Sequence, residues 1–445
     1  MTPRAALGPR RGEAGASAVG GQGPDRAPGR NSPDRRPAIF IVHPSDLLTD
    51  HLPDGDGLVA FGFIERLAAR GHRLHVAARR VALRGGLPPN VTLYPLACGE
   101  ADGPVSRLRY MFAARRLLRR LRRSEPIGIV HQMNPVFAGL SLGLIGSGLP
   151  LVLGTFVARW PAETRGGGIG AAVRAAAAGA ARWAVTLAQQ AQASALLMTT
   201  PAAADRIAWQ ALSRGKMFTV RHGIDTDMFS PAERWREQAR QAGPPSILFY
   251  SQLNRCKGVL VLVEAFRVVA EAVPGCRLTL VGRGDHVEEV ERAVASSGVG
   301  HLISIPGRVE RTRAPELFRA HSVYCLPSYG EPYATTVLEA MACAKPLVVT
   351  DQGGLPHMMP PEGAVRVPVG DPRALASALI EVLGSPERQI AMGSANRAFM
   401  ERHCTWDRVV DDLEAVYARV LQGGRRRPGA QAPVRPPERS PALHG

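Results

Sequence analysis

The sequence predicts an α/β protein made of two Rossmann-like domains that face a cleft. The chain of 445 residues is too long for one ordinary core. Short β-branched runs alternate with helical stretches, and this alternation stops at residues 222–245 and then restarts. Because repeated βα units form parallel sheets with helices on both faces, each half of the chain is expected to form one such sheet.

The first half contains six short apolar runs of the kind that form buried strands. They are expected at 38–43, 74–77, 127–131, 149–153, 195–198 and 218–220. A helix is expected from Leu58 to Arg70, with Gly71 ending it. We assign residues 37–222 to the N-terminal Rossmann-like domain.

The second half repeats the pattern with shorter intervals. Strands are expected at 247–250, 277–281, 302–305, 323–326 and 346–349, and helices at 259–273, 286–296, 315–320 and 336–342. Residues 223–404 therefore form the C-terminal Rossmann-like domain, and a last helix at 405–421 is expected to pack back on the body. Ligands of open α/β sheets bind beyond the carboxyl ends of the strands, so the cleft is the expected site.

Both ends of the chain are rich in Pro, Gly and Arg. Residues 1–36 carry 7 Arg and 3 acidic residues, and residues 421–445 carry 5 Arg and 1 acidic residue, so the ends supply about half of the net charge of +17. Segments of this composition cannot bury enough apolar surface to become ordered, so we expect disordered tails at 1–36 and 422–445. No nucleic-acid-binding motif accompanies the charge, which argues against nucleic acid as a partner.

The remaining composition predicts a soluble, cytoplasmic protein. No apolar run is long enough to span a membrane, and the N-terminus has no hydrophobic signal core. The six cysteines show neither a C-x-x-C pair nor zinc-ligand spacing. We interpret them as buried free thiols in a reducing compartment.

The strongest motif runs from Ser328 to Gly354, through a loop, a helix and a strand. Glu331 lies in the loop, and Glu339 lies about one turn into the helix. A helix N-terminus presents unpaired N–H groups to a diphosphate, and a nearby carboxylate can accept hydrogen bonds from sugar or ribose hydroxyls. A structural alternative stays open, because Thr336-x-x-Glu339 also fits a capping box.

This segment resembles the Glu-x7-Glu signature of family 4 glycosyltransferases, which are retaining enzymes of the GT-B fold. Similar pieces follow the order of that family: His222-Gly-Ile-Asp225, Leu253-x-x-x-Lys257-Gly258, Val281-Gly-x-Gly284 and Gly307-x-Val309. The resemblance covers roughly residues 38–421. It implies that the N-terminal domain binds an acceptor and the C-terminal domain a nucleotide-diphosphate sugar, with no metal and no cofactor.

The resemblance also assigns roles to single residues. Glu339 would hold the ribose hydroxyls, Glu331 would hold the donor sugar, and Lys257 would neutralise the leaving phosphates. His131, Lys257 and Glu331 are the expected catalytic residues. Further expected contacts with the donor are Gly57, Gln252, Arg255, Gly282, Val309 and the backbone amides of Tyr333, Ala334 and Thr335. Lysine is scarce in this chain, with three among 55 basic residues, which favours a specific role for Lys257.

The chain departs from the family in one phosphate-binding loop. The family usually has Gly-Arg-Leu before this lysine, and its arginine also grips the phosphates, whereas this chain has Ser251-Gln252-Leu253. Glutamine can donate a hydrogen bond but carries no charge. We expect Arg255, on the same loop, to compensate. A smaller departure is Ala344, where the family usually has glycine.

Two candidate site residues lie in the first half. His131 ends a strand where the family often has a histidine that contacts sugar or acceptor, and a structural histidine is the alternative. Some members read His-x-His here, and Met133 replaces the second histidine. Gly57, in Asp54-Gly-Asp-Gly57, would let the backbone approach the diphosphate, and a plain turn is the alternative.

Residues 105–123 hold 8 Arg and no acidic residue, with Leu108, Phe112, Leu118 and Leu121 interleaved. This pattern fits a basic amphipathic helix on anionic lipid, which would place the protein on the inner membrane face. It also fits the solvated face of a core helix.

Three other activities use the same residues. A glycoside hydrolase would use Glu331 and Glu339 as acid and base, but eight helical residues separate two backbones by about 12 Å. Hydrolase carboxyl groups lie about 5–9.5 Å apart. A nucleotide-sugar epimerase and a non-catalytic sugar-nucleotide-binding protein stay open, the second because of Gln252. The acceptor is unidentified and can be a glycan, a lipid-linked molecule or a small molecule.

Overall fold

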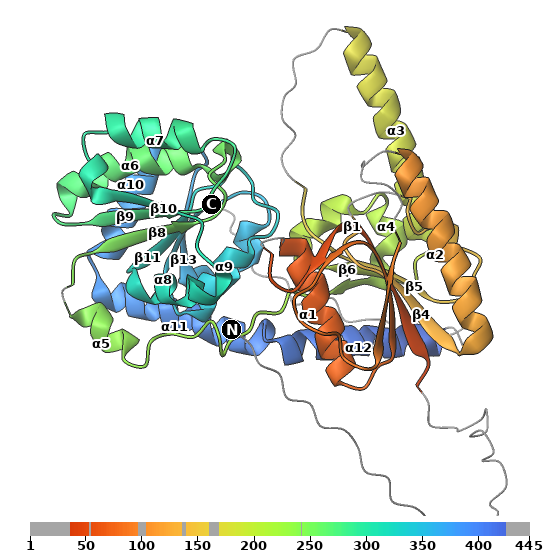
Figure 1. Ribbon diagram of the computed structural model, residues 1–445. Coiled ribbons are helices and arrows are strands. Elements are labelled where there is room, and N and C mark those ends of the chain that lie inside the picture. Colours follow the sequence, from red (N-terminus) through yellow and green to blue (C-terminus); the bar gives the residue numbers. More distant parts are fainter. Residues whose placement is uncertain are drawn as a thin grey trace, which may run out of the picture. The chain divides into compact units, whose positions relative to one another are not determined.

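A computed structural model describes residues 36–52, 55–96, 104–135, 139–159, 169–241 and 243–423 of the chain. Two parallel sheets with accompanying helices organise these residues (Figure 1). The predicted α/β fold with two Rossmann-like domains is therefore confirmed. The tails predicted at 1–36 and 422–445 lie outside the described residues except for Arg36 and residues 422–423, and Asp54 and Cys98 also lie outside them.

The first sheet has seven strands in the order β3-β2-β1-β4-β5-β6-β7. They are β1 (Ala38–Thr49), β2 (Leu74–Ala82), β3 (Val91–Pro95), β4 (Ile127–Gln132), β5 (Leu151–Phe156), β6 (Ala195–Met198) and β7 (Met217–Thr219). Its helices are α1 (Gly55–Ala69), α2 (Pro104–Ser124), α3 (Ile169–Gln192) and α4 (Gln210–Ser213). The strand order reverses between β1 and β4, and such a switch point is where ligands bind in sheets of this kind.

Alternate residues of β1 enter opposite layers of the first domain. Ile39 and Ile41 belong to one apolar cluster, which also contains residues of α1, and Phe40 and Val42 belong to the cluster that contains residues of α2. A parallel strand that is buried on both faces reads as an unbroken apolar run. That is why the segment 38–42 was recognisable as a strand.

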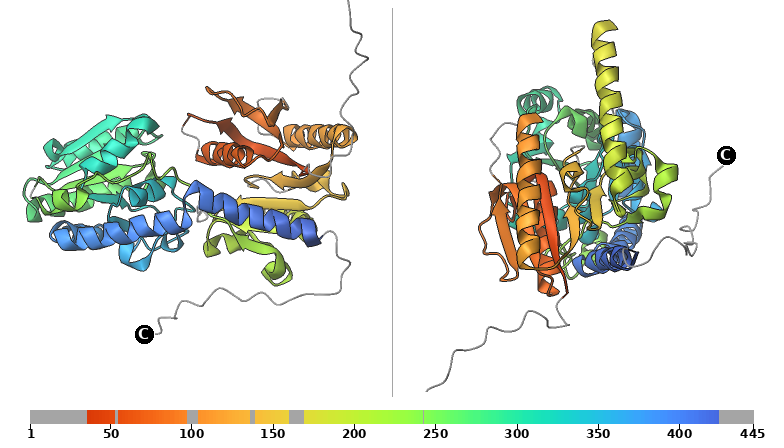
Figure 2. Two further views of the ribbon diagram at one scale, coloured as in Figure 1. Left: turned by 90° about the horizontal axis from the view of Figure 1, so that it is seen from below. Right: turned by 90° about the vertical axis from the view of Figure 1, so that its right-hand side faces the viewer.

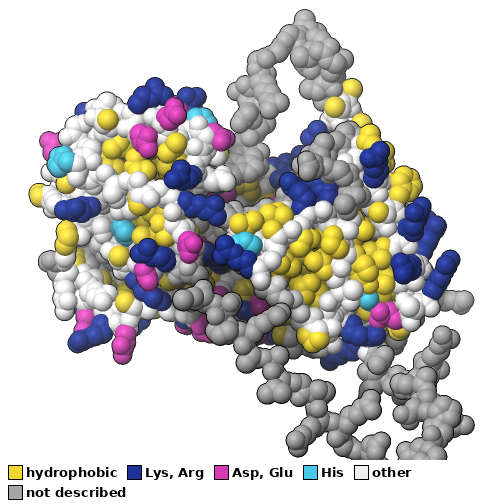
Figure 3. All heavy atoms as spheres, in the orientation of Figure 1, with side chains coloured by type: hydrophobic (Ala, Val, Ile, Leu, Met, Phe, Trp, Pro, Cys, Tyr) yellow, Lys and Arg dark blue, Asp and Glu magenta, His cyan; other side chains and the backbone are white. Residues whose placement is uncertain are grey.

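Helix α2 packs on the sheet through one of its faces. Leu118 and Leu121 are buried there, and the hydroxyl of Tyr110 donates a hydrogen bond of 2.7 Å to the carbonyl oxygen of Ala77. The interpretation of residues 105–123 as a core helix with an Arg-rich outer face therefore holds for the buried face of α2. Basic side chains follow the outer side of the helix along the right-hand edge of the molecule in Figure 3.

The last described helix, α12 (Trp406–Gly423), also belongs to the first domain, although it comes last in the sequence. Val409 and Val410 are fully buried in the cluster that contains Ile39 and Ile41. The ring of Trp406 lies so close to two glycines that a Cβ at Gly62 would come within 2.2 Å of it, and a Cβ at Gly223 within 2.4 Å. Figure 2 shows α12 in dark blue, lying along the first sheet.

Ion pairs on the surface also connect α1 to α12. Arg70, at the end of α1, pairs with Asp411 and, at 2.8 Å, with Glu414. The Nε2 atom of His72 lies 2.6 Å from the same Glu414 carboxylate. Several charges in one network contribute more than an isolated exposed pair does, so this network supports the docking of α12.

The second sheet has six strands in the order β10-β9-β8-β11-β12-β13. They are β8 (Ser246–Tyr250), β9 (Arg277–Val281), β10 (Ile303–Gly307), β11 (Val323–Leu326), β12 (Leu347–Thr350) and β13 (Ala364–Val367). The remaining helices are α5 (Trp235–Arg240), α6 (Val259–Ala272), α7 (Val287–Ser296), α8 (Ala314–Ala320), α9 (Thr335–Ala342), α10 (Pro372–Leu383) and α11 (Pro386–His403). Here the strand order reverses between β8 and β11.

Two of the three lysines satisfy backbone carbonyls at the ends of helices. Lys216 donates to the carbonyl oxygens of Gln190, Ala191 and Ala193 at 2.8–3.1 Å, at the C-terminal end of α3. Lys345 donates to that of His321 at 2.8 Å, just beyond α8. A compact ammonium with three donors suits this task. The presence of lysine at these two positions, in a chain where lysine is scarce, therefore has a structural explanation.

Candidate active site

The switch point of the second sheet brings Lys257 and Glu331 together. Lys257 ends η4 (Arg255–Lys257), a single 3₁₀ turn after β8, and Glu331 lies in the loop after β11. The Nζ atom of Lys257 lies 2.5 Å from Oε2 of Glu331, and the two side chains are only 12% and 7% exposed. The two residues that the sequence placed at the donor site thus form one buried ion pair.

Gly258 explains why a glycine follows this lysine. Its φ angle is +71°, and a Cβ at this position would lie 1.8 Å from the carbonyl oxygen of Pro327. The backbone amide of Tyr329 also donates to the carbonyl oxygen of Cys256 at 2.8 Å. The backbones of the loops after β8 and β11 can therefore pack against each other. This close packing brings the side chains of Lys257 and Glu331 within reach of each other.

Glu339 is buried on α9, and its carboxylate pairs with an arginine. Its Oε1 atom lies 3.2 Å from Nη2 of Arg311, which begins η6 (Arg311–Arg313) after β10. The capping-box interpretation is wrong, because the N-cap of α9 is Ala334 and no side chain caps the helix. Thr336 instead accepts a hydrogen bond of 2.8 Å from the hydroxyl of Tyr324. Burial raises the pKa of Glu339 to about 7, and Arg311 counteracts part of this rise.

The start of α9 contacts the segment that follows the first sheet. The hydroxyl of Tyr333 accepts a hydrogen bond of 3.3 Å from the amide of His222, and the two rings meet edge to face at 4.6 Å. The amide of Ala334 points to the sulfur of Met358 at 3.4 Å. The predicted contacts of the amides of Tyr333, Ala334 and Thr335 with a diphosphate stay predictions.

The loop that departs from the family pattern has its own contacts. Gln252 is exposed and accepts a hydrogen bond of 3.2 Å from the side chain of Asn254. Arg255 forms two bonds of 2.9 Å to the carboxylate of Glu289 on α7. Arg255 would have to break its pair with Glu289 before it could replace the missing arginine, and compensation by Arg255 stays a prediction.

Gly282 and Val309 lie at the ends of neighbouring strands of this sheet. The amide of Gly282 donates to the carbonyl oxygen of Gly307 at 2.9 Å. A Cβ at Gly282 would lie 1.9 Å from the carbonyl oxygen of Ser251, so only glycine fits there. Val309 is partly buried against the core. Gly282 and Val309 thus follow β9 and β10, in the sheet whose strand β8 precedes Lys257, and their predicted contacts with a donor stay predictions.

His131 and Gly57 lie near the switch point of the first sheet. The Nε2 atom of His131 lies 3.1 Å from the carbonyl oxygen of Gly154, and Nδ1 lies 2.6 Å from the hydroxyl of Tyr417 on α12. A carbonyl only accepts, so Nε2 carries the proton, and burial lowers the pKa of His131 to about 4. A catalytic role of this neutral ring would require the release of one of these bonds.

Gly57 has a structural reason of its own. A Cβ at Gly57 would lie 1.9 Å from the carbonyl oxygen of Leu47, so glycine lets the first turn of α1 approach β1. This contact explains the glycine without a ligand, and the predicted approach of a diphosphate stays a prediction.

A small pocket at the carboxyl ends of β4 and β5 contains residues that the sequence did not single out as site residues. His222 and Thr155 line it together with Asp56 and His131. The Nε2 atom of His222 lies 2.7 Å from the hydroxyl of Thr155, while its buried Nδ1 has no hydrogen-bond partner among the described residues. The sequence signal was present, since His222 opens the His-Gly-Ile-Asp segment. Arg311 was also missed, two residues beyond Val309.

In the described segments of the chain, no three His, Cys, Asp or Glu side chains group in a way that could hold a metal ion. None of the helices in those segments combines the length and the apolar character that crossing a membrane requires. The five described cysteines are free thiols, and four of them are buried.

Comparison with known families divides the chain in the same two halves as the sheets. Residues 53–228 match the family model described as Glycosyltransferase Family 4, and residues 231–399 match the one described as Glycosyl transferases group 1. A D-inositol 3-phosphate glycosyltransferase of Segniliparus rotundus is 29% identical over 228 residues, which are 49% of each chain.

A phosphatidyl-myo-inositol mannosyltransferase of Mycobacterium leprae is 30% identical over 226 residues, which are 49% of this chain and 58% of the relative. The chain thus spans about half the length of these relatives. Among solved structures, a sucrose-phosphate synthase from Thermosynechococcus elongatus has a TM-score of 0.66 at 20% identity, covering 87% of this chain and all of the other. HepE from Anabaena, solved in complex with UDP, has a TM-score of 0.65 at 14% identity, covering 86% of this chain and all of HepE. Both structures share the fold of two parallel-sheet domains.

Proposed function

Because the chain belongs to the family 4 glycosyltransferases, we propose that it moves a sugar from a nucleotide-diphosphate donor to an acceptor with retention of anomeric configuration. The donor would bind at the carboxyl ends of the second sheet. The acceptor would bind at those of the first sheet. We favour glycosyl transfer over a nucleotide-sugar epimerase and over a non-catalytic binding protein, because the matched families are named for glycosyl transfer.

The observation that supports this proposal best is the buried Lys257–Glu331 pair at the switch point of the second sheet. An ammonium has three donors, so Lys257 can hold Glu331 and a phosphate oxygen at once. In that position Lys257 would stabilise the charge that develops on the leaving diphosphate, and Glu331 would accept hydrogen bonds from the hydroxyls of the sugar. This lysine takes the part that a metal ion plays in other transferases, so we propose transfer without metal or cofactor.

The test of the function starts with binding and proceeds to turnover. UDP, GDP and ADP are compared by thermal shift, and a nucleotide at 100 times its dissociation constant should add about 2.7 kcal/mol to the free energy of unfolding. Sugars on the nucleotide that binds are then offered with D-inositol 3-phosphate and with phosphatidylinositol, the acceptors that the names of the relatives suggest. Transfer with unchanged anomeric configuration, in the presence of a chelator, supports the proposal. A wild-type protein that binds none of the three nucleotides contradicts it.

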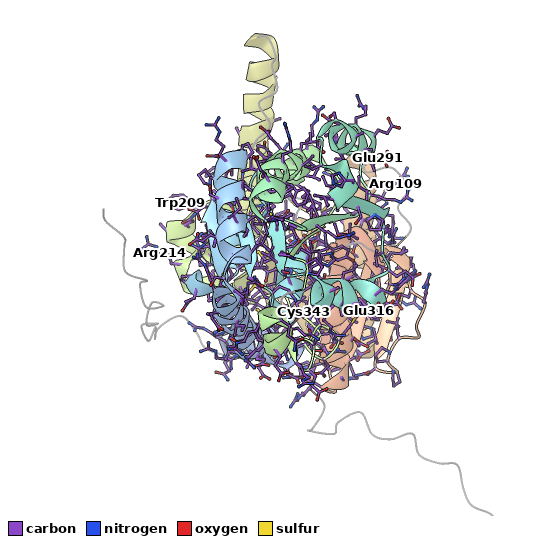
Figure 4. The ribbon with its side chains drawn as sticks, turned by 90° about the vertical axis from the view of Figure 1, so that its left-hand side faces the viewer. Arg109, Trp209, Arg214, Glu291, Glu316 and Cys343 are labelled. Atoms are coloured by element: carbon purple, nitrogen blue, oxygen red, sulfur yellow. The ribbon has the colours of Figure 1, made fainter. Side chains whose placement is uncertain are left out.

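We further propose that the outer face of α2 contacts an anionic membrane. Val105, Leu108 and Phe112 lie on one helical face and are 61%, 52% and 64% exposed. Arg109 projects from the outer side of the same helix (Figure 4), and α2 contains no acidic residue. Apolar side chains that insert between lipids, with arginines beside them, suit an anionic interface. The sequence pattern also included Leu118 and Leu121 in the lipid-facing side, but these two residues are buried in the protein.

The membrane proposal predicts a loss of vesicle binding in a double variant, Leu108→Glu with Phe112→Glu. The protein should cosediment with vesicles that contain phosphatidylglycerol and not with pure phosphatidylcholine, and salt should weaken the binding. The double variant should lose this binding. Val268→Glu is the matched control, because Val268 is 48% exposed on α6 of the second domain. Equal binding by all three proteins would show that α2 is not the contact.

A further inference from the structure

We propose that Arg311 is a positioning residue of the nucleotide site, which keeps the carboxylate of Glu339 ionised and oriented to accept hydrogen bonds from the ribose. This inference rests on the proposed function, because it takes the nucleotide to bind at α9. None of the motifs that indicate the family includes Arg311. Its role follows from the contacts that it makes in this chain.

The geometry leaves part of the carboxylate available to a ligand. Among the described residues, Arg311 is the one ionic partner of Glu339, and its Nη2 atom lies 3.2 Å from Oε1. The arginine is held from its other side, since its guanidinium lies 5.4 Å from the centre of the buried Phe229 ring. Its side chain is 35% exposed, whereas that of Glu339 is 5% exposed. A more exposed cation thus pairs with one oxygen of a buried carboxylate, and in the proposed arrangement Oε2 would receive the ribose.

The charge on Glu339 depends on this arrangement, because burial alone favours the protonated acid. A protonated carboxyl has one oxygen that donates, and it loses the acceptor strength that a diol requires. Burial raises the pKa of Glu339 to about 7, and the opposing influence of Arg311 is what limits the rise. Loss of the positive charge at position 311 should therefore leave Glu339 protonated at neutral pH.

The other titratable groups around Glu339 do not compete with it near neutral pH. Tyr250 on β8 and Cys343 at the end of α9 face it, and burial raises the pKa of each to about 12. Burial likewise raises the pKa of Tyr324 on β11 well above its usual range. Arg308 also faces Tyr250. Lys345 also acts on Cys343, and burial lowers the pKa of Lys345 to about 8. The part of a titration between pH 5 and pH 9 that is lost in Glu339→Gln should therefore report Glu339.

The test measures the affinity for the best-binding nucleotide as a function of pH in the wild-type protein, Arg311→Gln, Arg311→Lys and Glu339→Gln. In the wild type the affinity should rise with pH through a midpoint at about 7. Arg311→Gln should move that midpoint upward by about one pH unit or more, with affinity recovered in alkali. Arg311→Lys keeps the charge and should stay close to the wild type. Glu339→Gln should show only the titration of the ligand's own phosphate.

A second readout does not need the nucleotide. The folded protein retains a proton on Glu339 that the unfolded chain releases, so the contribution of Glu339 to stability should fall as the pH rises from about 4.5 to about 7. In Arg311→Gln this fall should continue to higher pH, and in Glu339→Gln it should be absent. If the wild type binds a nucleotide but Arg311→Gln has the same midpoint and the same stability profile, the inference is overturned while the proposed function stands. If the wild type binds no nucleotide, the proposed function fails first.

Discussion

Replacing Lys257 by alanine should lower the affinity for the nucleotide-diphosphate donor about 10- to 150-fold, the equivalent of about 1.5–3 kcal/mol for a charge-assisted contact. The same change should destabilise the fold, because it leaves the carboxylate of Glu331 buried without its partner, and breaking a buried pair costs about 3–5 kcal/mol. Affinity is measured by calorimetry at a temperature where the variant is folded, and stability by denaturant unfolding.

The pair offers its own control for separating these two effects. Glu331→Gln removes the buried charge, so the double variant with Lys257→Ala should regain much of the lost stability. It should not regain affinity, because the cation that meets the phosphates is still absent. If Lys257→Ala binds the donor as the wild type does, the lysine serves only the fold. If the double variant recovers affinity, the loss in the single variant came from distortion around Glu331.

Replacing Val410 by aspartate should destabilise the first domain by about 3 kcal/mol or more. Val410 is fully buried in the cluster that α12 shares with α1 and β1, and a charge cannot be accommodated there without a partner. Ala418→Asp is the matched control, because it adds the same side chain to an exposed position of the same helix. That control should cost less than about 1 kcal/mol. Equal stabilities of the two variants in denaturant would mean that α12 is not part of this core.

Most of the second sheet could be predicted from the sequence because its strands are short, apolar and separated by helices with clear periodicity. β9 and β11 have the predicted bounds. The strands β3 and β13 were missed. In β3 only Val91 is buried, and in β13 only Val367, so neither segment has the apolar run that marks a buried strand. The alanines of α3 hide its period, because alanine contrasts little with either face of a helix.

The residues of the candidate site could be proposed from the sequence where they lie close together or follow a known motif, as Glu331 and Glu339 do, and their roles stay predictions. Contacts between distant residues were not predictable. His131 receives a hydrogen bond from Tyr417, 286 residues later, and no local pattern indicates that partner. Arg311 reaches Glu339 from another strand end, and Arg255 is held by Glu289 on a neighbouring helix. Motif spacing along the chain indicates which residues are candidates for binding a ligand. Only the fold shows which of these side chains already form hydrogen bonds or ion pairs with other residues of the protein.

The backbone conformation of Ala344 explains why the family usually has glycine at this position. The residue follows α9 with a φ angle of +55°, a left-handed conformation that glycine adopts at lower cost than alanine. The usual glycine at this position therefore has a backbone reason. The alanine keeps the same turn, because it is buried in the second domain and its neighbours fix the conformation.

The position of α12 has a consequence for the order in which the protein is made. Its buried residues Val409, Val410 and Leu413 complete a cluster whose other members, such as Ile39 and Ile64, leave the ribosome several hundred residues earlier. Until then α1 covers this face of the first sheet without α12, so the apolar side chains that α12 buries stay exposed while the whole second domain is synthesised. Domains usually fold in the order of their synthesis, but this topology lets the second domain close its own sheet first. The first domain can therefore reach its final packing only after α12 has been synthesised, which is later than the whole of the second domain.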